Sequence, residues 1–118
     1  MAPVRTVRQA NLPLTQATFF ILLSLSPGRK HGYAILKDVQ ALSQNRVVLS
    51  TGTLYGSLKR LLEQGWIVRV EEPGAPPSAR ERKAYALTDL GRRALGIETE
   101  RLANLVQVAR RRSVRVQT

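Results

Sequence analysis

A short run between residues 50 and 60 concentrates side chains that donate hydrogen bonds to phosphate or to base edges. Ser50 and Thr51 precede an amphipathic stretch, so their hydroxyls and the free N–H groups of a helix start could bind a phosphate. Lys59 and Arg60 follow on its polar side, and such cations contact phosphate oxygens or guanine edges. The set that we expect at a nucleic-acid surface is Ser50, Thr51, Gly52, Thr53, Tyr55, Gly56, Lys59 and Arg60.

The same stretch predicts a helix of about 15 residues, with Ser50 as its N-cap and Gly65 just beyond its end. Gly52 and Gly56 fall one turn apart on its outer face. Glycine inside a helix costs about 0.5–1 kcal/mol relative to alanine, so a bare surface here favours close approach to a groove wall. The alternative is a solvated amphipathic helix with an ordinary cap. The face that we expect to be buried carries Leu54, Leu58, Leu61 and Leu62.

A second group of cations falls in a predicted β-hairpin. Residues 66–70 and 82–87 are β-rich runs on either side of a Pro- and Gly-rich loop at 73–79. Cations beside a groove-reading helix contact phosphate or the minor groove. The alternative is an edge strand that its charges keep solvated. The cations at the tip and on the returning strand are Arg80, Arg82 and Lys83.

The whole chain is strongly basic. Its 118 residues carry 19 Lys and Arg against 8 Asp and Glu, a formal net charge of +11, and Arg outnumbers Lys 15 to 4. Arg is the better bidentate ligand for phosphate and guanine. The charge favours a nucleic-acid partner, although an Arg-rich genome would give the same composition.

Composition also excludes several kinds of chemistry. The chain has no cysteine and one histidine, which excludes disulfides, thiol catalysis and Cys-containing zinc sites. It shows no nucleophile–base pair, no phosphate-cradling Gly loop and no ligand cluster, so we expect no enzymatic activity, no cofactor and no metal. The most apolar run, residues 19–23, is far shorter than the roughly 18 residues of a membrane span. Without an export signal, a cytoplasmic location and no membrane partner are expected.

The order of the elements indicates the fold class. Two helices precede the one at residue 50, the hairpin follows it, and Thr88 caps a last helix ending near Arg112. This order predicts a mainly α (α+β) winged helix-turn-helix. The short β-branched run at 47–49 could form a small strand or simply an extended segment that leads into the helix at residue 50. The first two helices are expected at 14–26 and 31–43. The expected organisation is a flexible basic arm at 1–11, a DNA-binding domain at 12–88, a C-terminal dimerisation helix at 89–112 and a basic tail at 113–118.

The last helix carries more apolar residues than a small core needs. An apolar stripe on a projecting helix is a candidate interface, and a reader of a palindrome needs two half-sites about 34–36 Å apart. A homodimer is therefore expected. The alternative is that the helix folds back over its own core. The expected dimerisation residues are Leu95, Leu102, Leu105, Val106 and Ala109.

Three segments together resemble the PadR family of bacterial transcription regulators. They are HGYAI from residue 31, STGTLYGSLKRLLEQGWI from residue 50, and RKAYALT from residue 82 with Gly91 and Arg92 behind it. Each segment is weak alone, but the ordered combination is specific and covers about residues 12–109. Thr51 stands where the family often has Pro, and either residue can start a helix.

The resemblance implies a short, single-domain, homodimeric repressor. Its third helix would read a palindromic double-stranded operator, and its last helix would pack against the partner subunit. Some family members lose DNA on binding a small-molecule effector. By position, Thr53, Tyr55 and Lys59 correspond to the family's DNA-contacting helix.

Two other functions are compatible with the charge. A non-specific basic nucleic-acid-binding protein would share it but would not need the bare glycine face. Two Phe, three Tyr and one Trp are few for the stacking that single-strand recognition requires. A winged helix used only for protein contact would not need the cations of the third helix.

Overall fold

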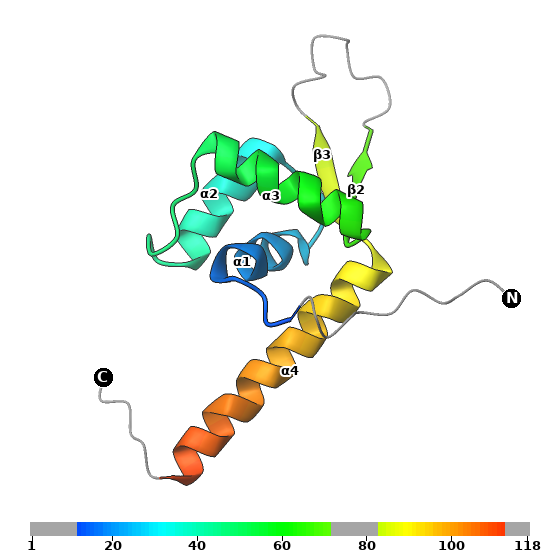
Figure 1. Ribbon diagram of the computed structural model, residues 1–118. Coiled ribbons are helices and arrows are strands. Elements are labelled where there is room, and N and C mark those ends of the chain that lie inside the picture. Colours follow the sequence, from blue (N-terminus) through cyan, green and yellow to red (C-terminus); the bar gives the residue numbers. More distant parts are fainter. Residues whose placement is uncertain (1–11, 72–82, 113–118) are drawn as a thin grey trace, which may run out of the picture.

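A computed structural model describes residues 12–71 and 83–112. The predicted arm at 1–11, the hairpin tip with Arg80 and Arg82, and the tail at 113–118 lie outside these residues. Figure 1 shows helices α1 to α3 packed together, the strands beside them, and α4 running out past the domain. The elements are α1 Gln16–Leu25, β1 Lys30–His31, α2 Gly32–Leu42, α3 Thr51–Gln64, β2 Ile67–Val70, β3 Ala84–Leu87 and α4 Asp89–Arg111.

The predicted fold class is confirmed: the described chain is mainly helical, with a small sheet and a long C-terminal helix. Each helix contributes an apolar stripe to one core, which the sheet closes on one side. The core residues are Ile21, Leu22, Leu25, Ile35, Val39, Leu54, Leu58, Leu61, Trp66, Ile67, Tyr85, Ala94 and Leu95.

The sheet has three strands where the sequence predicts two. Its order is β1-β3-β2 and both pairings are antiparallel. The added strand is only Lys30 and His31, which pair with Tyr85 and Ala84. A two-residue strand has no alternation to detect, so only the long-range pairing reveals it. The run at 47–49 is extended but belongs to no strand.

Local signals place the helix ends. Ser50 and Thr88 are N-caps as predicted, each accepting a hydrogen bond from the backbone N–H three residues on. Gly65 ends α3 with a φ of 75°, a left-handed conformation that glycine adopts without steric cost. The first helix begins at Gln16 rather than at residue 14, because Thr15 caps it.

A close backbone contact fixes the start of α4. A Cβ atom at Gly91 would lie 1.9 Å from the Trp66 carbonyl oxygen, so only glycine fits there. The same carbonyl accepts a 3.1 Å hydrogen bond from the Thr88 N–H, and the Thr88 hydroxyl donates to the Gly65 carbonyl at 2.6 Å. The α3–β2 junction therefore sets the direction in which α4 leaves the domain.

Only the first part of α4 contacts the core. Its 23 residues span about 34 Å at 1.5 Å per residue. Its buried residues are Gly91, Ala94, Leu95 and Glu98. The later part of the helix runs out past the domain, as Figure 1 shows.

Candidate nucleic-acid interface

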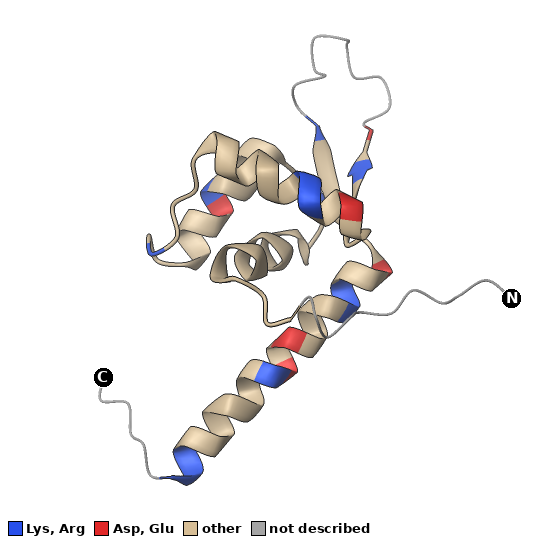
Figure 2. Cartoon of the chain, viewed as in Figure 1, with Lys and Arg blue, Asp and Glu red and all other residues tan. Residues whose placement is uncertain are grey.

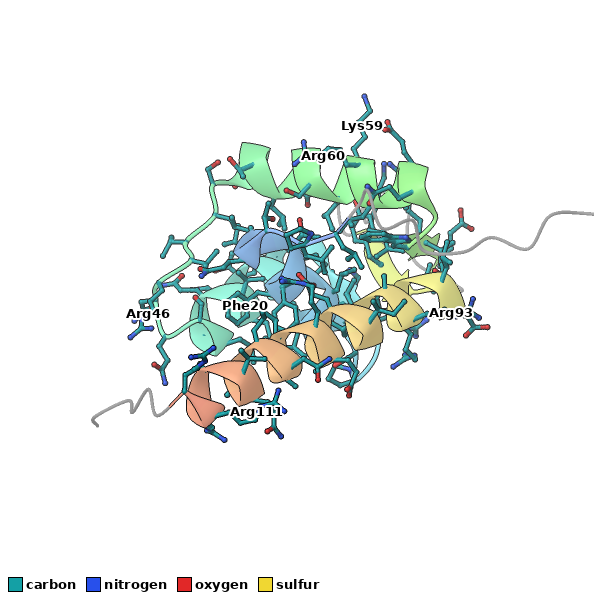
Figure 3. All side chains as sticks on the ribbon, turned by 60° about the horizontal axis from the view of Figure 1, so that its bottom comes forward. Phe20, Arg46, Lys59, Arg60, Arg93 and Arg111 are labelled. Atoms are coloured by element: carbon teal, nitrogen blue, oxygen red, sulfur yellow. The ribbon has the colours of Figure 1, made fainter. Side chains whose placement is uncertain are left out.

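Helix α3 presents one buried face and one polar face. Leu54, Leu58 and Leu61 are at most 2% exposed, which confirms the predicted inner stripe. The polar face lies on the side of the domain away from α4, where Figure 3 shows Lys59 and Arg60 pointing outward. Of the residues predicted at this surface, Tyr55 is 41% exposed and Gly56 is half-buried. The other exposed residues of the set are Ser50, Thr51, Gly52, Thr53, Lys59 and Arg60.

The N-terminus of α3 combines a cap with open donors. The Ser50 hydroxyl oxygen accepts from the Thr53 N–H at 3.1 Å and its proton goes to the Thr53 hydroxyl oxygen at 2.9 Å. The N–H groups of Thr51 and Gly52 have no acceptor within residues 12–71 and 83–112. Since the positive end of the helix dipole adds to these donors, the turn can hold a phosphate.

The two glycines of the outer face have no packing reason to be glycine. A Cβ atom at Gly52 would meet nothing within 4 Å, and one at Gly56 would meet only the Arg60 guanidinium at 3.8 Å. Alanine would fit at both positions within the described chain. The two glycines therefore leave this part of the outer face bare of side chains.

Tyr55 connects α3 to the start of α2. A Cβ atom at Gly32 would lie 2.6 Å from the Tyr55 hydroxyl oxygen, so the missing side chain makes room for the tyrosine. The ring covers the first turn of α2 and leaves 41% of Tyr55 exposed. The surface of α3 is thereby continuous with that of α2.

The cations near α3 differ in availability. Lys59 is exposed, whereas Arg60 donates to the Ser57 hydroxyl at 3.2 Å. Lys30 is occupied, since its ammonium donates to the Ser24 carbonyl at 2.6 Å and lies 3.8 Å from Asp38. Lys83 is exposed directly before β3. Figure 2 shows basic residues on α3 and at the hairpin stem, and others at the free end of α4.

The hairpin stem is built on a buried tyrosine. Tyr85 is 2% exposed and faces Arg69 across the β2–β3 pairing. Burial raises the pKa of Tyr85, and the neighbouring Arg69 partly opposes this rise. The tyrosine therefore stays neutral and anchors the strand that leads to Lys83.

The predicted dimerisation residues divide between two environments. Leu95 is 8% exposed and packs in the chain's own core, so the expectation of an exposed interface side chain is wrong there. Leu102, Leu105 and Val106 are 37–54% exposed, and Ala109 is half-buried. Ile97 and Val108 are also exposed, but they fall off the seven-residue spacing, so the periodicity does not predict them.

Glu98 is the last buried side chain of α4 and is held by three hydrogen bonds. It accepts from the Leu14 N–H at 2.6 Å and from two nitrogens of Arg101 at 2.5 and 3.1 Å. The bonds from Arg101 lower the pKa of the carboxyl, and the Leu14 N–H adds to this, against the opposing effect of burial. Glu98 therefore joins the segment before α1 to α4 as a carboxylate.

A cavity of about 380 Å³ opens beside Glu98, between α1, the end of α2 and α4. Leu42, the last residue of α2, lines the cavity and is 42% exposed. The lining is largely apolar, with two arginines. It comprises Leu14, Gln16, Phe19, Phe20, Leu42, Ser43, Gln44, Arg46, Glu98, Arg101 and Leu102.

The described residues hold no group of three His, Asp or Glu side chains that could bind a metal ion. In the same part of the chain, no helix has the length and apolar character of a membrane span.

The sequence that forms α3, the hairpin and the first part of α4 matches a known family. The family described as transcriptional regulator PadR-like matches residues 21–97, well over half of the chain. The chain belongs to the PadR-like family. The family predicted from the three sequence segments is thereby confirmed.

Solved structures of PadR-like proteins share this fold. The chain is similar to a PadR family transcription regulator from Clostridium difficile R20291, with 25% identity and a TM-score of 0.69 over 85% of this chain and 100% of that one. It is also similar to Bacillus subtilis PadR in complex with operator DNA, with 26% identity and a TM-score of 0.60 over 71% of this chain and 45% of that one.

A relative by sequence is an uncharacterised 37.1 kDa protein in transposon TN4556 of Streptomyces fradiae. The two are 34% identical over 89 residues, which is 75% of this PadR-like chain and 24% of the relative. The chain thus spans about a quarter of that protein's length.

Proposed function

We propose that this chain is a homodimeric, sequence-specific double-stranded DNA-binding repressor that reads a palindromic operator with α3. The observation that carries the proposal is the outer face of α3. It combines two glycines without a packing role, open N–H donors at its start and the exposed Lys59. A bare, cationic helix face is suited to close approach in a major groove.

Competition binding tests the sequence-specific part of the proposal. A duplex from upstream of the gene for this chain should bind at least about 10³-fold more tightly than a scrambled duplex at the same salt concentration. Equal binding of the two duplexes would refute a specific regulator and favour the non-specific basic binder. Repression itself is tested by a reporter gene behind the same duplex.

A matched pair of variants locates the interface. Lys59→Ala should weaken binding to the upstream duplex, and Arg93→Ala should not. Both substitutions remove one exposed cation, but Figure 3 shows Arg93 on α4, apart from the face that carries Lys59. Equal losses in the two variants would mean that net charge, not this face, binds the DNA.

The homodimer in the proposal is supported by the continuous face of α4. At 100° per residue, Leu102, Leu105 and Ala109 lie within about 40° of the direction of Glu98, which faces the core. The face that covers the core therefore continues past the domain, where Leu105 is 54% exposed. A second copy of α4 is the matching surface.

The dimer is tested by changing the apolar face. Leu105→Glu should give a folded monomer by light scattering, with weaker binding to the palindrome but an unchanged affinity for a single half-site. Glu100→Gln on the same exposed turns is the control. A dimer that persists in Leu105→Glu would place the interface elsewhere.

Release by a small-molecule effector also belongs to this proposal. The cavity beside Glu98 is within the size range of small-molecule pockets, and its lining is mostly apolar. An effector that acts there should lose its effect on operator binding when Phe20→Trp fills the cavity. An effect that survives this variant would assign the effector to another site.

A further inference from the structure

The segment HGYAI remains without a role in the proposed reading by α3. Its glycine is explained by the fold, because Gly32 makes room for the Tyr55 hydroxyl. Its tyrosine is not, since Tyr33 is 69% exposed and lies outside the core. Tyr33 is the most exposed large apolar or aromatic side chain in the described residues.

A lysine ammonium lies over the exposed ring of Tyr33. The ammonium of Lys37, one turn further along α2, lies 5.6 Å from the centre of the ring, a distance typical of a cation–π interaction. Such a contact holds the long lysine side chain toward the start of the helix without neutralising its charge. Lys37 therefore presents a positioned positive charge on the surface of α2.

The two flanks of α2 differ in charge. On one flank, Asp38 lies 3.8 Å from Lys30, whose ammonium also reaches the Ser24 carbonyl at the end of α1. That flank faces α1 and its charges compensate each other. At 100° per residue, Tyr33 and Lys37 fall on the other flank, about 100° or more from Asp38, where no described carboxylate compensates Lys37.

The uncompensated flank adjoins the candidate interface. Tyr33 follows Gly32, and Gly32 is covered by Tyr55 of α3. Figure 1 shows the start of α2 beside α3, on the side of the domain opposite to α4. In helix-turn-helix proteins the helix before the recognition helix crosses the DNA backbone.

We propose that Lys37, held over the ring of Tyr33, contacts a DNA phosphate beside the groove that α3 enters. The inference rests on the proposed function and adds a second contact on a different helix. A phosphate contact positions the protein without reading bases. It predicts that Lys37 contributes to affinity and not to discrimination between sequences.

The salt dependence of binding tests the contact. Lys37→Ala should weaken binding to the upstream duplex and to the scrambled duplex by the same factor, about fivefold at 0.15 M salt for one phosphate contact. The slope of log K against log salt should become less steep by about 0.9. Arg93→Ala, the control with the same loss of charge, should leave the slope unchanged.

Substitutions of Tyr33 separate the contribution of its ring to DNA binding from that of its hydroxyl. Tyr33→Phe keeps the ring and should bind like the wild type. Tyr33→Ala should weaken binding, and the double variant with Lys37→Ala should be no weaker than Lys37→Ala alone. Because both side chains are exposed, thermal unfolding should be unchanged in every variant.

Several results would overturn the inference. An unchanged slope in Lys37→Ala would exclude the phosphate contact. A loss confined to the upstream duplex would assign Lys37 to base reading instead. Additive losses in the double variant would exclude support by the ring. If the wild type bound neither duplex, the proposed function would fail together with this inference. If Lys37→Ala bound both duplexes as tightly as the wild type, only the inference would fail.

Discussion

Replacing Glu98 with alanine tests whether the segment before α1 is tied to α4 by this side chain. Glu98 is 1% exposed and accepts from the Leu14 N–H, which lies 84 residues away in sequence. The variant leaves that part-buried N–H without an acceptor, a loss of about 1–3 kcal/mol. Arg101 loses its partner too, but its side chain is 37% exposed and can turn to water. The larger penalty of a stranded buried charge therefore does not apply.

We expect the free energy of unfolding to fall by about 2 kcal/mol, which moves the midpoint of urea unfolding by about 1 M for a typical small protein. Circular dichroism measures the midpoint, and all variants are compared at one protein concentration because subunit dissociation makes the midpoint depend on it. Glu100→Ala, an exposed carboxylate on the next turn of α4, should change stability by less than about 0.5 kcal/mol. Equal midpoints for the two variants would refute the role given to Glu98.

The pH dependence gives an independent check. The pKa of Glu98 is lowered from its usual 4.5, first by the bonds from Arg101. Its carboxylate therefore stabilises the fold fully above about pH 4.5, and this contribution is lost as the pH falls through the lower pKa of the folded state. The difference in stability between wild type and Glu98→Gln should shrink on acidification below pH 4.5. A difference that stayed constant from pH 7 down to 3 would contradict the lowered pKa.

Three further predictions separate packing from binding. Gly91→Ala should abolish or severely weaken folding, because its methyl group would overlap a backbone carbonyl oxygen. Gly96→Ala has open space around its methyl group and should raise the free energy of unfolding by about 0.5–1 kcal/mol in the same urea titration. Gly56→Ala should likewise stabilise the free protein and yet weaken operator binding in a competition assay; tighter binding would contradict close approach at this position. Leu95→Ala should cost about 2–5 kcal/mol of unfolding free energy, while Leu102→Ala should mainly raise the dimer dissociation constant measured by analytical ultracentrifugation.

The elements that the sequence predicts well are those with local signals. Ser50 and Thr88 precede amphipathic stretches, and Gly65 follows one, so caps and ends are visible in the residue order. The inner leucines of α3 recur at helical spacing and are buried as expected. Since these features depend on neighbours within a few residues, they need no knowledge of the fold.

The elements that the sequence does not predict depend on distant partners. Lys30 and His31 form a strand only because β3 lies beside them. In the sequence, Glu98 resembles a solvated charge on an exposed helix. In the structure, its carboxylate accepts a hydrogen bond from the distant Leu14 N–H. Leu95 and Leu102 share a seven-residue spacing, but only Leu95 packs into the core, which periodicity alone cannot show.

Two glycines show most clearly why both the sequence and the three-dimensional structure are needed to explain a residue. Gly56 and Gly91 are alike in the sequence, since each interrupts a predicted helix at the same cost in stability. In the structure, a methyl group at Gly91 would overlap the Trp66 carbonyl, whereas one at Gly56 would meet only a flexible guanidinium at 3.8 Å. The fold therefore accounts for Gly91 completely and leaves Gly56 unexplained. A residue that costs stability and fills no packing need within the described chain is what the proposed close approach of operator DNA to the polar face of α3 predicts at this position.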